Sequence, residues 1–107
     1  MDLHIKNMSY SKKLPIISEK EFVEKASAIK EFSSPRGQRY EVLSVEGKIM
    51  KFKRLDAKSG KSESFSLHAV YVAYDCIEEF LAESFIPFVS SKHSPARALL
   101  LALKLIG

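Results

Sequence analysis

The sequence contains a single cysteine and no tryptophan, and its 107 residues include only four glycines and four prolines. One cysteine, Cys76, excludes an intramolecular disulfide and is typical of a reducing compartment. We expect its thiol to be buried and unreactive, because Tyr74, Ile77 and Phe80 lie near it in an apolar stretch. No repeat or low-complexity tract is visible. With 46% hydrophobic and 28% charged residues, the chain has too much apolar surface to remain disordered.

Long hydrophobic runs are also missing. The most apolar stretch, residues 98–106, is interrupted by Lys104 and is far shorter than the ~20 residues of a membrane-spanning helix. Residues 1–13 are polar and lack the apolar core of a secretory signal. We therefore expect a cytoplasmic protein that does not enter a membrane. The length predicts one domain, which we expect to be an α+β domain over residues 16–107. Residues 1–15 are expected to form a flexible leader.

The sequence also lacks the residue clusters that catalysis and metal binding require. The three histidines, His4, His68 and His93, are scattered and have no cysteine near them. No zinc-type spacing results, and no serine or cysteine nucleophile can be matched to a base. We therefore expect no catalytic residues, no metal and no cofactor, and the protein is not predicted to be an enzyme.

Two short motifs have simpler interpretations than the chemistry they suggest. The segment 60–62 reads Gly-Lys-Ser, like the end of a phosphate-binding loop, but Leu55 stands where that loop needs its first glycine. The segment 46–48 reads Glu-Gly-Lys, a spacing found in metal-dependent nucleases. Such a site needs a second acidic residue on a neighbouring strand, and Glu41 is the only one nearby. A hairpin turn at residues 46–47 is the simpler explanation.

The N-terminal helix has the clearest start in the sequence. Ser18 is a good N-cap residue, and Glu21 completes a capping box three positions later. Ile17 and Phe22 occupy the positions of a hydrophobic staple. The polar segment 33–37, which contains proline and glycine, is expected to end the helix.

Three strand-like runs follow, over residues 40–45, 48–55 and 62–67. Turns at residues 46–47 and 56–61 are short, which favours antiparallel neighbours in a three-stranded meander. Alternation places Met50 and Phe52 toward the core, together with Phe65 and Leu67. The opposite face then carries Lys51, Lys53, Ser64 and Ser66.

The C-terminal third is predicted to be helical. An apolar stripe indicates a helix over residues 68–83, and Ser94 followed by Pro95 indicates the start of a last helix. The predicted fold is therefore an α+β class: a three-stranded antiparallel meander with an N-terminal helix and two C-terminal helices packed on one face. The last helix is apolar almost all round, so it is buried either in its own core or against a partner.

Positive charge is concentrated in one internal segment. Residues 36–61 contain eight basic and three acidic residues, whereas the rest of the chain has nine basic and ten acidic residues. A basic sheet face attracts phosphates, and a β-ribbon fits the major groove of DNA. The candidate nucleic-acid-binding residues are Arg39, Lys51, Lys53, Arg54, Lys58 and Lys61. Tyr40 is the one aromatic candidate for stacking on a base, so DNA is favoured over RNA.

Two alternatives remain open at this point. Exposed lysines on a sheet can simply keep a protein soluble and prevent edge pairing. The apolar stretches 80–89 and 96–106 can form a protein-interaction or self-association surface, including a homodimer. The order of three strands and a helix with Ala-Tyr-Asp at residues 73–75 is similar to the DNA-binding domains of plant ethylene-response factors, but the chain lacks their tryptophans and this similarity identifies no family.

Overall fold

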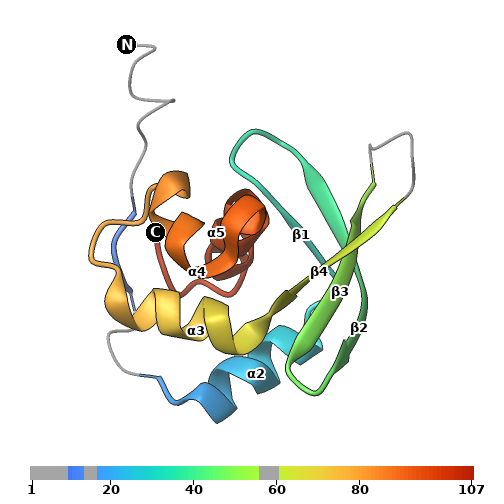
Figure 1. The fold of residues 1–107 in the computed structure, drawn as a ribbon, viewed down its shortest axis with the longest axis horizontal. Helices are drawn as coiled ribbons and strands as arrows, with labels where there is room; N and C mark the ends of the chain where they lie inside the picture. Colours follow the sequence, from blue (N-terminus) through green and yellow to red (C-terminus); the bar gives the residue numbers. More distant parts are fainter. Residues whose placement is uncertain (1–9, 14–16, 56–60) are drawn as a thin grey trace.

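The computed structural model describes residues 10–13, 17–55 and 61–107. Within them a helix precedes a four-stranded antiparallel sheet, and a helical C-terminal third follows it, so the α+β prediction is confirmed (Figure 1). The first half consists of helix α2 (Glu19–Ala28) and strands β1 (Glu31–Ser33), β2 (Arg39–Glu46), β3 (Ile49–Arg54) and β4 (Ser62–Ser66). The second half consists of helix α3 (Leu67–Cys76), the short helices η1 (Ala82–Phe85), α4 (Ile86–Val89) and η2 (Ser90–Lys92), and helix α5 (His93–Ala102).

Helix α2 begins where its capping residues predict. The Ser18 hydroxyl accepts a hydrogen bond from the backbone N–H of Glu21 at 3.1 Å, which satisfies one of the free donors at the helix start. Phe22 and Ala26 are fully buried on one side of the helix. The helix ends earlier than expected, at Ala28, because the next residues turn back and form a strand.

That strand, β1, was not predicted. It is only three residues long and pairs antiparallel with β2, so the sheet has four strands in the order β1-β2-β3-β4 rather than three. The turn between β2 and β3 is formed by Gly47 and Lys48 and not by residues 46–47. Both turn residues have positive φ, 55° and 65°, as the tight hairpin turn requires. The predicted turn at residues 56–61 lies largely outside the described residues.

A β-bulge interrupts β2. The register to β3 shifts between Val42 and Ser44, which leaves Leu43 as an extra residue. Val42 and Val45, three positions apart, therefore both pair with core residues of β3. The bulge explains why simple alternation is ambiguous in this strand.

The inner face of the sheet carries one aromatic ring from each strand. Phe32, Tyr40, Phe52 and Phe65 follow one another across the four strands, with neighbouring ring centroids 5.0, 5.7 and 4.9 Å apart. All four side chains are buried. Their row is the centre of the core, and it occupies the face that alternation predicted for Phe52 and Phe65.

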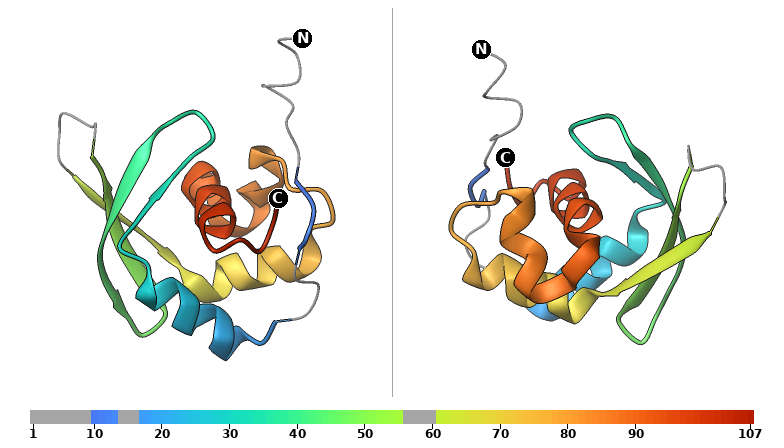
Figure 2. Two further views of the ribbon diagram at one scale, coloured as in Figure 1. Left: turned by 180° about the vertical axis from the view of Figure 1, so that it is seen from behind. Right: turned by 45° about the horizontal axis from the view of Figure 1, so that its top comes forward.

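The helices cover this inner face and leave the other face of the sheet bare (Figures 1 and 2). The predicted helix 68–83 was wrong in its second half: α3 ends at Cys76, and the chain then turns into η1 and α4. Cys76 is exposed at the end of α3, so the expectation of a buried thiol was also wrong. Helix α5 begins at His93 and has Ser94 and Pro95 in its first turn, one residue earlier than the predicted cap.

The C-terminal segment of the chain pairs with part of the predicted leader. Lys12 and Ile106 form an antiparallel bridge, supported by hydrogen bonds of Ser11 with Gly107 and of Lys13 with Leu105. Residues 10–13 therefore belong to the folded body, and the rest of the predicted leader, residues 1–9 and 14–15, lies outside the described residues. Within the described ranges, no helix is both long and apolar enough to cross a membrane.

Candidate interaction surface on the outer face of the sheet

The bare face of the sheet, called here the outer face, is built from residues that alternate with the buried aromatic row. Strand register places its side chains in cross-strand rows. One row consists of Ser44, Lys51 and Ser64, one from each of β2, β3 and β4. The neighbouring rows consist of Glu31, Glu41, Lys53 and Ser62 on one side and of Glu46, Ile49 and Ser66 on the other.

Acidic residues accompany the basic residues on this face. Arg39 donates to Glu31 across β1 and β2 at 2.9 Å, and Lys53 lies 3.5 Å from Glu41 across β2 and β3. Both pairs are exposed, so each contributes little to stability. They do neutralise much of the positive charge that the sequence places here, and the outer face is far less basic than composition alone suggests.

The predicted nucleic-acid-binding residues do not all meet on one surface. Arg39, Lys51 and Lys53 share the outer face, and Lys61 is exposed directly before β4. Arg54 pairs with the buried Tyr40 and lies on the inner side of the sheet, so its expected place on the basic face was wrong. The alternation that puts Met50 and Phe52 inside also puts Arg54 inside. Lys58 lies outside the described residues.

Tyr40 is 2% exposed and its hydroxyl donates to Gln38 at 3.0 Å. Because its ring packs between Phe32 and Phe52, it is not accessible for stacking on a base.

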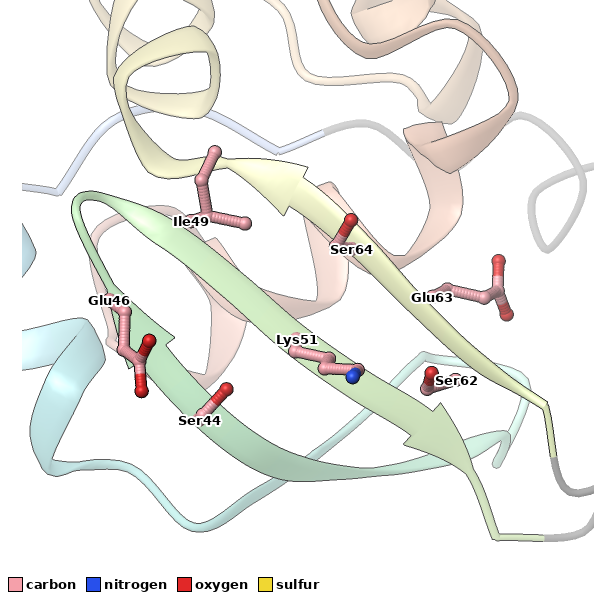
Figure 3. A pocket seen from close by; sticks show the side chains of 7 residues that line it. All are labelled: Ser44, Glu46, Ile49, Lys51, Ser62, Glu63 and Ser64. Atoms are coloured by element: carbon pink, nitrogen blue, oxygen red, sulfur yellow. The ribbon is translucent and has the colours of Figure 1, made fainter.

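An open hollow of about 540 Å³ lies on the outer face. Its lining is mostly polar: three serines, Lys51, Glu46 and Glu63, with Ile49 as the one large apolar side chain. Figure 3 shows Lys51 extending over the sheet toward Ser62, with Ser44 on one side of it and Ser64 on the other. Ile49 is 46% exposed, which is unusual for an isoleucine and places an apolar contact beside these hydroxyls.

Strand β4 forms one border of the hollow. The edge of β4 that faces away from β3 has no neighbouring strand among the described residues. The N–H of Leu67 donates to the carbonyl of Lys48, which shows that every second residue of this strand turns its backbone groups toward β3. Phe65 and Glu63 follow the same pattern, so the backbone groups of Ser62 and Ser64 point away from the sheet. Among the described residues, no backbone hydrogen bond from another segment reaches this edge.

Strand β4 has few of the features that usually prevent a sheet edge from pairing with another strand. Its five residues include no proline, and its register with β3 has no bulge. Its one inward-pointing charge, Glu63, is neutralised by Lys92 at 2.9 Å. The opposite edge differs, because β1 is only three residues long and helix α5 packs beside it.

A second polar cluster joins three elements near the β2–β3 turn. Glu19 at the start of α2 accepts from Lys48 at 2.7 Å and lies 3.0 Å from Nδ1 of His68 on α3. These two hydrogen bonds lower the pKa of Glu19 below its ordinary value. Each member has a partner within the cluster, so its arrangement is structural. In the described parts of the chain, no three His, Cys, Asp or Glu residues come together as metal ligands would.

The apolar C-terminal stretches are mostly core. Leu99, Leu100, Leu105 and Ile106 are buried at 2% exposure or less. Phe88, Leu101 and Leu103 are partly buried against this core, and Ile86 on α4 is 49% exposed. The apolar density of residues 96–106 is therefore explained by packing within the domain.

The chain was compared with known protein families, with curated proteins and with solved structures, and none of the three comparisons gives a match. The properties of the outer face and of the β4 edge are therefore the basis for a functional assignment.

The open edge of β4 was not predicted from the sequence, which placed Ser64 and Ser66 only on the sheet face opposite the core. The signal available was the pattern Ser-x-Ser-x-Ser over residues 62–66 in the last strand of a meander. Such a strand has a neighbour on one side only unless the chain returns to it.

Proposed function

We propose that this protein is a small binding module that takes an extended segment of a protein partner as a fifth strand along β4. The observation that carries the proposal is the row of backbone groups at Ser62 and Ser64, which point away from β3. An extended peptide laid beside such an edge continues the ladder of hydrogen bonds. Each bond contributes about 0.5–1.5 kcal/mol net, and side chains on alternate positions supply specificity.

The serines favour this function over simple solubility. Sheet edges that only have to avoid aggregation commonly carry lysine, proline, a bulge or an inward-pointing charge, and of these β4 has only Glu63, which is neutralised by Lys92. Here the outward positions of β4 carry serine, whose small side chain lets another backbone approach closely. The adjoining hollow then receives the side chains of the added strand that lie on the outer face.

The test is selection of ten-residue peptides from a random library against the full chain, followed by affinity measurements on two variants. Ser64→Pro removes an N–H that points to the free edge without removing a bond to β3, a position that an edge strand tolerates. We expect it to weaken binding by about two- to tenfold, which corresponds to the loss of one such hydrogen bond. Ser33→Pro, the matched change on the β1 edge, should leave affinity unchanged.

Two results count against the proposal: that no peptide is selected, or that selected peptides bind Ser64→Pro as well as the unchanged protein. Circular dichroism and thermal melting establish that both proline variants are folded. If Ser64→Pro fails to fold, Ser62→Pro repeats the test at the neighbouring outward position.

Nucleic-acid binding is the second candidate, and one observation supports it. Lys51 and Lys53 stand beside the serines of β4, with Lys61 at the start of that strand, and lysine and serine side chains are common phosphate contacts. Three glutamates on the same face repel phosphate, which ranks this function second.

Fluorescence anisotropy with labelled duplex DNA, single-stranded DNA and RNA tests the second candidate. Three phosphate contacts predict that log affinity falls with log salt at a slope of about −2 to −3. The double variant Lys51→Glu, Lys53→Glu should abolish this binding. No binding at about 50 mM salt, where charge is weakly screened, would contradict it.

A further inference from the structure

Charge is graded across the outer face of the sheet. The acidic residues of that face stand on β1 and β2: Glu31, Glu41 and Glu46. Strand β3 contributes Lys51 and Lys53, the second of them 3.5 Å from Glu41. Strand β4 contributes serines to this face, and its Glu63, which is paired with Lys92, borders the hollow. Lys61 is exposed directly before β4. The open edge of β4 is thus the basic side of a face that is nearly neutral as a whole.

The strand that would join β4 lies within reach of these lysines. Neighbouring strands are about 4.8 Å apart, so the added strand runs roughly 10 Å from β3. Only the serines of β4 stand between the two on the outer face. A lysine and a glutamate side chain extended toward each other span this distance above the short hydroxyls.

We propose that the partner segment is acidic on one face, with Glu or Asp at every second residue. Period-two alternation places these carboxylates on the outer face, opposite Lys51 and Lys53. The intervening residues then lie on the inner side, beside Phe65 and the ion pair of Glu63 with Lys92, so we expect them to be uncharged and β-branched, as an extended strand favours. This inference rests on the proposed function, because it names the chemistry of the strand that the β4 edge receives.

Two synthetic ten-residue peptides test the proposal, one alternating valine with glutamate and the other valine with lysine. Each is titrated into the full ¹⁵N-labelled chain, and the amide resonances of Ser62 and Ser64 report binding at β4. We expect the glutamate peptide to bind at least about tenfold more tightly at low salt, and this difference to shrink as salt screens the charges.

Charge reversal shows which residues cause the preference. The double variant Lys51→Glu, Lys53→Glu should prefer the lysine peptide. Arg39→Glu is the matched control: it changes a basic residue of the same outer face, but on the far side beside Glu31, and should leave the preference for the glutamate peptide intact.

The outcomes separate this inference from the function on which it rests. Equal binding of both peptides at Ser62 and Ser64 overturns the acidic preference and leaves strand addition standing. Binding that shifts neither amide overturns both. If the same resonances shift when the protein alone is concentrated, the edge binds a second copy of the chain and the proposal is overturned. Displacement of the glutamate peptide by an equal concentration of duplex DNA also overturns the proposal.

Discussion

The two faces of the sheet use the same strands for opposite purposes. The inner face carries one aromatic ring from each strand, and all four rings are buried. The outer face carries serines, lysines and glutamates in the same rows, and none of the helices in the described ranges covers it. Because neighbouring residues of a strand point to opposite faces, we expect that stability and the proposed binding can be changed separately by substitutions one position apart.

The largest expected effect is on the inner face. Phe52 contacts the rings of Phe32, Tyr40 and Phe65, and its side chain is fully buried. Phe52→Ala should lower the free energy of unfolding by about 3–5 kcal/mol, because it leaves a cavity at the centre of the aromatic row. Urea unfolding measures this change. The neighbouring outer-face substitution Lys51→Ala should change it by less than about 0.5 kcal/mol. Similar losses in the two variants would contradict the division between the faces.

A smaller difference is expected between the ion pairs of the two faces. The inner pair, Lys92 with Glu63, joins η2 to β4 at 2.9 Å and is the more buried, whereas Lys53 and Glu41 lie 3.5 Å apart on the outer face. Lys92→Met should cost about 1 kcal/mol and Lys53→Met less than about 0.5 kcal/mol. Thermal unfolding of both variants measures the two losses of stability. An equal loss, or a larger loss in Lys53→Met, would contradict the greater burial of the Lys92–Glu63 pair.

The smallest effect concerns the surface cluster around Glu19. Its pKa is lowered in the folded protein by hydrogen bonds from Lys48 and His68. A carboxylate whose pKa is lowered by folding stabilises the folded protein at pH values above its ordinary pKa. This stabilisation is lost as the pH falls through the folded-state pKa. Glu19→Gln should therefore make stability less dependent on pH below about 4.5, the ordinary value. Urea midpoints at pH 7 and about pH 3 measure this, and an unchanged dependence on pH would show that Glu19 has no part in it.

Sequence patterns predicted the parts of this fold that depend on local chemistry. Ser18 caps the first helix because its hydroxyl meets the N–H of Glu21, three residues away. Met50, Phe52 and Phe65 lie on the predicted face because β3 and β4 alternate without interruption. These features can be inferred from residues that are close together in the sequence.

The parts that were missed depend on tertiary packing. Strand β1 is too short to show a period of two, and only its pairing with β2 defines it. The extra residue Leu43 hides the alternation of β2. The apolar stripe of α3 continues past its end, because Ile77 and Phe80 are buried outside the helix.

The candidate site was predicted in part. Lys51 and Lys53 share the outer face as alternation requires. The pairing of Glu31 with Arg39 was not predicted, because the two residues meet only through the register of β1, a strand that the sequence did not reveal. Arg54 was misplaced, although the alternation of β3 itself assigns it to the inner side.

The two edges of the sheet sharpen the comparison further. At both edges every second residue turns its backbone outward: Glu31 and Ser33 in β1, and Ser62 and Ser64 in β4. Strand β1 is short and lies beside α5, whereas β4 is longer and has no bulge or proline. The edge of β4 is therefore the place where we propose that a further strand is added.

Hydrogen exchange of the backbone amides in β4 tests this central claim most directly, because it needs no partner. In the free protein at low concentration, the amides of Glu63 and Phe65 should exchange slowly, since they face β3, and those of Ser62 and Ser64 should exchange close to the rate of an unstructured chain. NMR resolves the individual residues. Fast exchange that alternates with protection along the strand agrees with an open edge. Equal protection of Ser62 and Ser64 would show that the edge is already occupied and would contradict the proposed function.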